Sequence, residues 1–463
     1  MSAEHPLPTS PGRIVSVSQP CPGISPRLFL HATRGQPRVY WADGDALTFA
    51  GAGIATELIA WNQDRFRTIA RQARELFSGA VIHDAGQPAA GPRLFGGFAF
   101  RDDSILDNIW AGFHRAHFIL PHYQLTLLDG QPWLTINVVL TDDDNPGEVL
   151  PDLRAALAAR IDALRVAEEV PPANPMPRIG FAAQGGQLSY PMSYPIWEQM
   201  IDAALARIRT GELNKVVLSR VCELLLPHEV DIEARLDYLN THYPNCYRFL
   251  FEPHPHHAFY GATPELLAAT EGVQVRTMAL AGTIRRGATP DEDAALGRQL
   301  LGDSKERHEH QVVIDRLRQR LEPLTTELTV RQTDLLQLSN VQHLHTAISG
   351  RLKQARGILP LVELLHPTPA LGGDPREAAI RVIRESELVP RGWYAAPIGT
   401  IRHDLDGTFA VAIRSAISKE NRVWLYAGAG IVNGSTPERE WQETALKFRA
   451  MLNAFDVEEQ PNG

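Results

Sequence analysis

Cysteine is scarce in this chain of 463 residues, which contains only Cys21, Cys222 and Cys246. Three scattered cysteines are too few for a disulfide framework or a thiolate zinc site, and their odd number leaves at least one unpaired. The composition therefore argues against a disulfide-rich secreted protein. We expect the protein to work in a reducing cytoplasm.

Long apolar runs and a basic excess are also missing. No stretch of about 18 uninterrupted apolar residues occurs, and the start, MSAEHPLPTSPGR, lacks the basic and apolar regions of a signal peptide. Lysine plus arginine number 45 against 54 aspartates plus glutamates, a formal net charge of −9. The positive charge that attracts nucleic-acid phosphates is thus absent. We expect no membrane span, no export and no nucleic-acid partner, and small molecules as ligands.

The residues that are present indicate a folded globular protein, with 44% hydrophobic and 21% charged residues. In the first part of the chain, short apolar runs alternate with turn signals. We expect strands in RLFLHA, RVYWADGDALTFAG, LFGGFAF and HYQLTLLDGQPWLTINVVL. Hairpin turns are predicted at the -DGD- and -DGQ- steps, so this part should carry much antiparallel sheet.

Helices join the strands farther along the chain. Apolar residues at helical spacing predict an amphipathic helix over 148–168, which a proline cluster at 170–178 ends. After residue 190 we expect a helix, strands in KVVLSRVCELLL and CYRFLFEP, and later a long helix from about Thr289 to Glu322. We divide the chain into a β-rich amino-terminal half (1–185), a second region (186–457) and a polar tail (458–463).

Two pairs of glutamates stand three residues apart in segments of helical character. Glu306 and Glu309 lie in SKERHEHQVVIDRLRQRL, and Glu440 and Glu443 lie in TPEREWQETALKFRAML. Residues three apart point to the same side of a helix. The ordinary interpretation of each pair is a solvated face with salt bridges. The apolar and aromatic residues around both pairs favour another, because four carboxylates from two helices can bind Mg²⁺, which prefers oxygen ligands and keeps some waters.

The segment YAGAGIVNG contains Gly428, Gly430 and Gly434. Its spacing misses the dinucleotide-binding fingerprint by one residue, and no acidic residue is placed about 20 residues later to hold a ribose. A glycine-rich segment still offers close backbone approach and free N–H groups. These groups suit a small carboxylate.

Together these segments resemble a known family. From about residue 190 to residue 450, the chain is similar to the chorismate-binding domain of isochorismate synthases, anthranilate synthase component I, aminodeoxychorismate synthase component I and salicylate synthases. The resemblance is carried by LNKVVLSR, ATPELL, TMALAGTIRRG, SKERHEH, LHPTPALGG, GWYAAPIG, FAVAIRSA and AGAGIVNGSTPEREWQETALK. In the amino-terminal third, LFGGFAF is the clearest match. The resemblance implies a mixed α+β fold with two facing antiparallel sheets flanked by helices, Mg²⁺ as cofactor and chorismate as substrate.

Single positions within the resemblance distinguish the reactions of this family. The aminodeoxychorismate branch has a nucleophilic lysine where this chain has Ala281, so that covalent route is closed. The ammonia-using branches lack a lysine at the position of Lys215, whereas the water-adding branches place a lysine there as the general base. The resemblance therefore implies an isochorismate synthase, an isomerase in which water enters at C2 of chorismate while the C4 hydroxyl leaves.

Water addition with loss of a hydroxyl needs one base and one acid. The resemblance assigns the base to Lys215, which has to be neutral before the step, a form that burial or nearby positive charge favours. It assigns the acid to Glu265, which needs a raised pKa to stay protonated. The ordinary interpretations are a lysine that extends from a strand edge and a carboxylate in the first turn of a helix after Thr263-Pro264.

The resemblance also implies the binding residues. Mg²⁺ is expected at Glu309 and Glu443, with Glu306 and Glu440 acting directly or through waters, and would hold the ring carboxylate of chorismate. Arg414 and Lys447 match positions that bind the enolpyruvyl carboxylate, and arginine suits bidentate recognition of this group. The weaker correspondences are Gly282, Thr283, His366, Tyr426 and Gly430. For His366, the brace of a turn is an equally good interpretation.

Several alternatives stay open at this point. A salicylate synthase forms isochorismate and then eliminates pyruvate in the same pocket, and no single residue separates the two securely. An ammonia-using synthase would give anthranilate or aminodeoxychorismate. A non-catalytic metabolite-binding protein is disfavoured because the acid, base and metal positions are all filled. TMALAGTIRRG and the chain length favour the menaquinone-pathway type over a siderophore-pathway enzyme. We expect no obligate glutaminase subunit, and a monomer or homodimer.

Overall fold

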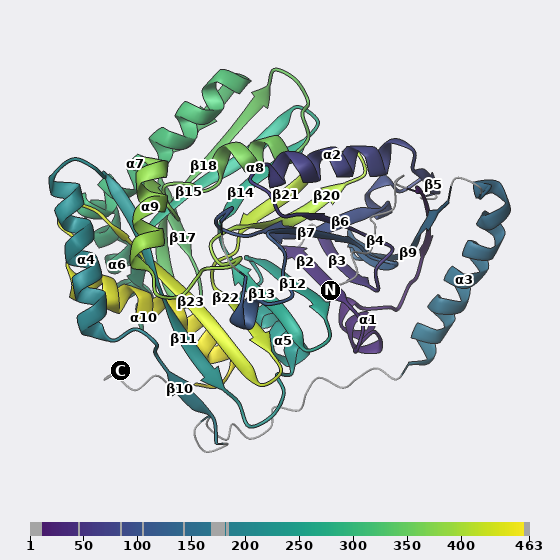
Figure 1. Ribbon diagram of the computed structural model, residues 1–463, viewed down its shortest axis with the longest axis horizontal. Coiled ribbons are helices and arrows are strands. Elements are labelled where there is room, and N and C mark those ends of the chain that lie inside the picture. The colour runs from purple at the N-terminus through teal and green to yellow at the C-terminus, as the bar shows by residue number, and fades with distance from the viewer. Residues whose placement is uncertain are drawn as a thin grey trace, which may run out of the picture.

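Two large β-sheets with helices around them form the computed structural model (Figure 1). It describes residues 12–457 except 45–46, 84–85, 104–105, 142–143, 168–180 and 182–184. The predicted α+β class with two sheets is confirmed. The predicted proline boundary and the polar tail lie outside the described residues. Within the described ranges, no helix is both long enough and apolar enough to cross a membrane.

The first sheet has thirteen strands in the part of the chain that the structure describes, and all but one of its pairings are antiparallel. Its order is β10 (Gln187–Ser189), β11 (Lys215–Leu225), β23 (Arg422–Ile431), β22 (Ser415–Lys419), β13 (His257–Thr263), β12 (Tyr247–His254), β2 (Arg38–Asp43), β3 (Leu47–Ala52), β8 (Tyr123–Leu128), β9 (Gln131–Leu140), β1 (Arg13–Pro20) and β5 (Val81–His83), with β19 (Gly373–Asp374) beside β11. The parallel pair is β1 with β5.

The second sheet has ten strands, counted over the same described ranges, and is antiparallel. Its order is β16 (Thr325–Val330), β18 (Val341–Leu352), β15 (Gln274–Arg285), β14 (Leu266–Glu271), β21 (Gly407–Val411), β20 (Pro397–Arg402), β6 (Arg93–Phe98), β7 (Ala116–Leu120) and β4 (Thr56–Ala60), with β17 (Asp334–Gln337) beside β18.

Helices surround the two sheets (Figure 1). The α-helices are α1 (Pro26–Ala32), α2 (Arg65–Ser78), α3 (Pro146–Val166), α4 (Tyr194–Arg209), α5 (Ile232–His242), α6 (Pro290–Gly302), α7 (Ser304–Leu321), α8 (Leu359–Leu365), α9 (Arg376–Ser386) and α10 (Pro437–Ala454). Short 3-10 turns are η1 (Pro88–Ala90), η2 (Asn108–Trp110) and η4 (Glu322–Leu324). The helix predicted over 148–168 is α3.

Strands from both parts of the chain pair in each sheet. In the first sheet β2 pairs with β12, with Trp41 opposite Phe249. In the second, β6 pairs with β20, with Gly96 opposite Gly399. Each sheet is therefore completed by residues from both sides of position 185, and the division of the chain there stays a prediction.

The chain passes from one sheet to the other at two adjacent places. Pro264 and Glu265 link β13 of the first sheet to β14 of the second, and residues 412–414 link β21 of the second to β22 of the first. Backbone hydrogen bonds tie the two links together, from Ala262 N to Arg414 O at 3.1 Å and from Val411 N to Glu265 O at 3.0 Å. This arrangement places Glu265 and Arg414 side by side at the boundary of the sheets.

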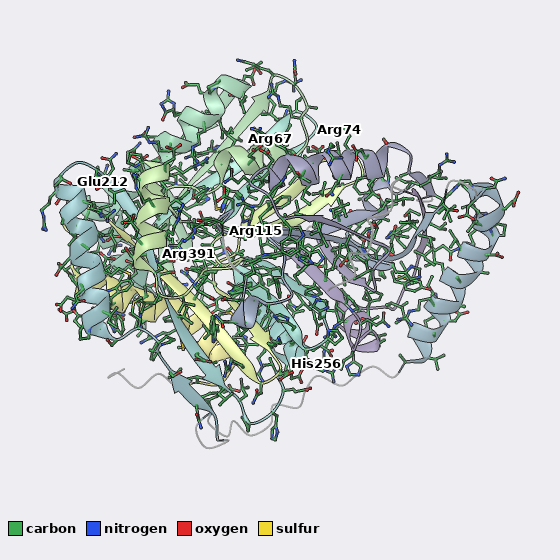
Figure 2. The ribbon with its side chains drawn as sticks, viewed as in Figure 1. Arg67, Arg74, Arg115, Glu212, His256 and Arg391 are labelled. Atoms are coloured by element: carbon green, nitrogen blue, oxygen red, sulfur yellow. The ribbon has the colours of Figure 1, made fainter. Side chains whose placement is uncertain are left out.

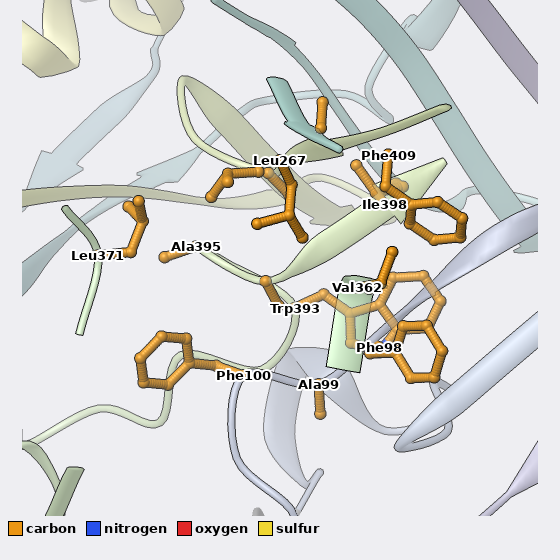
Figure 3. Close-up of a cluster of buried hydrophobic side chains, with 14 of the residues drawn as sticks. Phe98, Ala99, Phe100, Leu267, Val362, Leu371, Trp393, Ala395, Ile398 and Phe409 are labelled. Atoms are coloured by element: carbon orange, nitrogen blue, oxygen red, sulfur yellow. The ribbon is translucent and has the colours of Figure 1, made fainter. Parts of the chain in front are cut away.

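The main hydrophobic core includes inward-facing residues of both sheets, such as Trp41, Phe95 and Phe409. Figure 3 shows part of it around Trp393, with Phe98 and Val362 close by. A second core packs α3, α5 and α10 against the first sheet. Burial of this apolar surface is the main stabilising contribution to the fold.

Most charged side chains extend from the outside of the molecule, as Arg67, Arg74 and Glu212 do (Figure 2). Arg391 differs, because it is buried. Its guanidinium group donates to Val217 O at 2.7 Å and to Leu371 O at 2.8 Å, and it pairs with Glu387 at 2.6 Å.

Two predicted elements differ from the structure. RLFLHA was expected as a strand but lies in α1, because Ser25 accepts a hydrogen bond from Leu28 N at 3.1 Å and Pro26 takes the first helical position. The single helix expected from about Thr289 to Glu322 is two helices. α6 ends at Gly302, and Asp303 caps a new helix by accepting from Lys305 N at 2.9 Å and Glu306 N at 3.1 Å.

The cap of α7 leads to a stability prediction. Asp303→Ala removes the acceptor for two N–H groups, so we expect the free energy of unfolding to fall by about 1 kcal/mol, measured by urea denaturation. The amides of Lys305 and Glu306 should also exchange hydrogen faster.

The control is Asp231→Ala, which removes the equivalent cap of α5, where Asp231 accepts from Ala234 N at 3.1 Å. It should cost similar stability and leave the amides of α7 protected. Unchanged exchange at Lys305 and Glu306 in Asp303→Ala would contradict the role of Asp303.

Candidate active site

A cavity lies where the two sheets meet, between the crossing links, the glycine-containing parts of β15 and β23, and the helices α7 and α10. It brings together many of the residues predicted from the sequence. These are Glu265, Gly282, Thr283, Glu309, Arg414, Gly430, Glu443 and Lys447. Apolar side chains, among them Val217 and Leu371, complete the wall.

Glycines allow the wall to come close to the charged groups. Gly282 lies at a β-bulge of β15 and has a φ of +70°, which favours glycine. At Gly430, an added Cβ would lie 2.2 Å from Glu309 Oε1 and 2.9 Å from Lys215 Cε. A side chain at position 430 would therefore displace both charged residues.

Lys215 begins β11 and its side chain is completely buried. Nζ donates a hydrogen bond to Glu309 Oε1 at 2.7 Å. The strand is held at this end by β19, where Lys215 is paired with Asp374, and Asp374 in turn accepts from Asn214 and Arg316. Lys215 is thus fixed beside Gly430 and Glu309, two residues of the cavity wall.

Glu265 is a buried carboxyl group whose environment favours the neutral form. Burial raises its pKa to about 8, against the opposing effect of the positive charges on Lys215, Arg414 and Lys447. It stands in the link between β13 and β14, so the helix-start interpretation of Thr263-Pro264 is wrong. At neutral pH this group can donate a proton.

Arg414 is buried and has a φ of +51°, in the left-handed region that most residues avoid. Its Nη2 donates to Nε2 of His343 at 3.1 Å. His343 then carries its proton on Nδ1 and donates to Gly282 O at 2.9 Å. Because burial lowers the pKa of His343 to about 3, the ring is neutral and leaves the positive charge of Arg414 uncompensated. Nε of Arg414 is buried without a partner in the described structure.

The two helical glutamate pairs meet, with ammonium groups between them. Glu306 and Glu309 come from α7, and Glu440 and Glu443 from the start of α10. Lysines contact all four carboxylates: Lys305 Nζ lies 3.2 Å from Glu306 and 3.0 Å from Glu440, Lys447 Nζ lies 2.6 Å from Glu443, and Lys215 pairs with Glu309. The solvated-face interpretation is wrong for Glu306, Glu309 and Glu440, which are buried.

Crowding of like charges shifts the titration of these groups. Burial and the neighbouring Glu309 raise the pKa of Glu306, while burial and Glu443 raise that of Glu440 to about 7. Burial opposes ionisation of Glu443 as well, yet Lys447 and Lys305 hold its pKa below the usual value. One carboxylate oxygen each of Glu306 and Glu440, Oε2, is buried without a partner in the described part of the chain.

As these side chains stand, no three His, Cys, Asp or Glu residues in the described ranges converge as metal ligands. The lysine contacts explain why the carboxylates do not converge, because each carboxylate is oriented toward the ammonium group that it contacts. The chemistry of the cluster nevertheless fits a hard divalent cation, since its donors are carboxylate oxygens and two of them are unpartnered.

Two predicted binding residues do not line the cavity. His366 directly follows α8, and its Nε2 lies 3.0 Å from Phe100 O, so it braces the chain. Tyr426 accepts from Trp110 Nε1 at 2.9 Å, donates to Pro390 O at 3.0 Å and stacks on Tyr394. Tyr426 thus lies behind Tyr394, which lines the cavity, and the contact of His366 and Tyr426 with substrate stays a prediction.

Three further residues at the cavity or the glutamate cluster were not predicted from the sequence: Lys305, His343 and Tyr394. Lys305 could have been noticed, since it directly precedes Glu306 in SKERHEH. His343 and Tyr394 line the cavity from β18 and from the turn before β20. No local pattern marks either of them.

Comparison with known proteins identifies the family of this chain. The family model described as "Chorismate binding enzyme" matches residues 5–456. The chain belongs to the chorismate-binding enzyme family. The resemblance inferred from the sequence is confirmed.

Individual relatives are similar over nearly the whole chain. The salicylate biosynthesis isochorismate synthase of Pseudomonas aeruginosa is 37% identical over 429 residues, covering 92% of this chain and 86% of that protein. Isochorismate synthase MenF of Bacillus subtilis is 34% identical over 430 residues, covering 91% and 88%. The solved structure of MenF, the menaquinone-specific isochorismate synthase from Escherichia coli, has a TM-score of 0.77 at 27% identity, covering 96% of this chain and 95% of that one.

The raised pKa of Glu265 predicts a pH-dependent stability. A carboxyl group whose pKa is higher in the folded than in the unfolded chain favours folding below the unfolded value, near 4.5, and this contribution is lost as the pH rises through about 8. Glu265→Gln, which cannot ionise, should therefore become more stable relative to the wild type as the pH increases over that range.

Melting temperatures of both proteins at acidic, neutral and alkaline pH test this expectation. The matched control is Glu438→Gln on the exposed side of α10, whose difference from the wild type should stay constant. A constant difference for Glu265→Gln as well would show that the buried carboxyl group is not held neutral.

Proposed function

We propose that this protein is an isochorismate synthase, which converts chorismate to isochorismate by adding water at C2 and releasing the C4 hydroxyl. The observation that carries the proposal is one cavity whose wall holds Glu265, a carboxyl group kept protonated by burial, with the buried Lys215 directly behind the wall residues Glu309 and Gly430. The named relatives and the solved neighbour are isochorismate synthases, which supports the proposal.

In this proposal Lys215 is the general base. A neutral amine at Nζ would take the proton that the attacking water loses at C2. The 2.7 Å contact with Glu309 and the packing against Gly430 fix the position of Nζ directly behind these two residues of the cavity wall. Ala281, also at the wall, offers no amine for a covalent route.

Glu265 is the general acid. Its protonated carboxyl group would donate to the C4 oxygen as that oxygen leaves, so that water and not hydroxide is released. Because Glu265 and Lys215 come from different segments, one near a sheet crossing and one at a strand start, the acid and the base can act on different carbons of the ring.

The two carboxylates of chorismate need positive partners. Arg414 has a buried, unpartnered Nε, and Lys447 lies beside it on the cavity wall. We assign the enolpyruvyl carboxylate to these two residues. Backbone N–H groups near Gly282, Thr283 and Gly430 are the proposed additional donors.

Mg²⁺ is the proposed cofactor. Glu309 and Glu443 would hold it, with Glu306 and Glu440 acting directly or through waters, and the unpartnered Oε2 atoms of the latter two support this assignment. When bound, the ion would supply positive charge for the ring carboxylate of chorismate.

The product identifies the reaction. We expect purified protein with chorismate, Mg²⁺ and ammonium salts to form isochorismate, detected by mass spectrometry. Salicylate, detected by its fluorescence, would identify the salicylate synthase alternative. An aminated product as the main species would contradict water addition and identify an ammonia-using enzyme.

Lys215→Gln tests the base. It keeps a polar side chain but removes the amine, so kcat should fall by about 10² to 10⁴ while KM for chorismate changes little. The control is Lys353→Gln, which removes an exposed lysine that contacts Pro323 O and should leave turnover unchanged. Isochorismate formation near the wild-type rate by Lys215→Gln would eliminate this residue as the base.

The metabolic pathway, the cellular location and the oligomeric state are also proposals. We favour the menaquinone-pathway type, because the solved neighbour is menaquinone-specific and the Bacillus subtilis relative is MenF. The Pseudomonas aeruginosa relative, an isochorismate synthase of salicylate biosynthesis, supports a salicylate pathway instead. We further propose a cytoplasmic enzyme that works as a monomer or homodimer without a glutaminase subunit.

A further inference from the structure

Lys305 joins the two helices that carry the glutamates. It is the second residue of α7, where its backbone N–H donates to the capping Asp303. Its Nζ reaches across to α10 and lies 3.0 Å from Glu440 Oε1, while also lying 3.2 Å from Glu306 Oε1. The side chain is only 12% exposed, and Glu440 is fully buried.

The ammonium group occupies the place where a cation is needed. Glu306 and Glu440 are the two glutamates whose Oε2 atoms are buried without partners in the described structure. The positively charged Nζ of Lys305 contacts one oxygen of each of these two carboxylates. A divalent cation that binds Glu306 and Glu440 is therefore repelled by the positive charge of Lys305.

We propose that Lys305 is an internal counter-ion that competes with the divalent cation for Glu306 and Glu440, so that metal binding requires its ammonium group to leave. The inference rests on the proposed Mg²⁺ site. Lysine suits such a role, because its charge sits at the end of a flexible stem of four carbons that can move while the capped backbone stays in place.

The charge balance indicates what this competition achieves. Four carboxylates face the ammonium groups of Lys215, Lys305 and Lys447, so the substrate-free cluster is close to neutral overall. A divalent cation that displaces the ammonium group of Lys305 raises the net charge of the cluster by one unit, and a negatively charged substrate stabilises this added charge. Lys305 therefore weakens Mg²⁺ binding to the substrate-free enzyme and favours binding of metal and substrate together.

Titration calorimetry with Mg²⁺ on the full-length, metal-stripped protein without chorismate tests the inference. Lys305→Gln should bind Mg²⁺ at least about tenfold more tightly than the wild type. Its melting temperature without metal should be lower, since the carboxylates then repel one another, and Mg²⁺ should raise it more than in the wild type. Lys305→Arg keeps the charge and should keep wild-type affinity.

Arg439→Gln is the matched control. Arg439 lies 3.7 Å from the same Glu306, but its side chain is 55% exposed, so solvent screens its charge. Its removal should change Mg²⁺ affinity by less than about twofold. An equal increase in Mg²⁺ affinity in Lys305→Gln and Arg439→Gln would overturn specific competition by Lys305. It would indicate a general effect of removing one positive charge.

The outcomes separate this inference from the proposed metal site. If the wild type binds Mg²⁺ and Lys305→Gln binds it with the same or lower affinity, the proposed role of Lys305 is overturned, while the proposed metal site stands. Absence of binding in both, or unchanged affinity in Glu309→Gln and Glu443→Gln, would overturn the metal site and the inference with it. If Lys305→Gln fails to fold without metal, Lys305→Met is refolded with and without Mg²⁺. Competition between Lys305 and the ion predicts that Mg²⁺ restores folding of this variant. Failure to refold in both conditions would overturn the inference.

Discussion

Two links that cross between the sheets side by side determine where this protein can do chemistry. The hydrogen bonds between Ala262 and Arg414 and between Val411 and Glu265 bind the links to each other. The strands on either side of them pair within their own sheets, so neither link can move without disturbing both. A carboxyl group and a guanidinium group are thereby held at the boundary of the sheets, where β15, β23, α7 and α10 complete the cavity.

Burial of charge is the second constraint, and it gives chemically identical groups different properties. Glu265 stays protonated because burial outweighs the cations around it, whereas Glu443 stays ionised because Lys447 and Lys305 outweigh burial. A protonated and an ionised carboxyl group can therefore coexist in one cavity at one pH. Buried ions are costly unless they are paired, which explains why each of the four clustered glutamates contacts a lysine.

Much of this arrangement could be predicted from the sequence. The E-x-x-E spacing placed each glutamate pair on one side of a helix, and apolar periodicity located α3. The -DGQ- turn is present between β8 and β9, where Asp129 and Gly130 have the positive φ values that such a turn needs. Other expectations failed where a short polar signal outweighed the apolar pattern. Ser25 and Pro26 start a helix in an apolar run that had indicated a strand, and Asp303 divides a pattern that had indicated one long helix.

Local sequence by itself determined the residue types of the site and the side of the helix or strand on which each stands, because these depend on spacing and on backbone preferences over a few residues. Only the tertiary structure decided which residues meet. Lys305 lies beside Glu440 across 135 residues of sequence, Lys215 lies beside Glu309 across 94, and Tyr426 stacks on Tyr394, a residue of the cavity wall. These contacts depend on the order of strands in the two sheets and on the burial that results. Neither property is encoded in any single segment, since each strand is positioned by partners from distant parts of the chain.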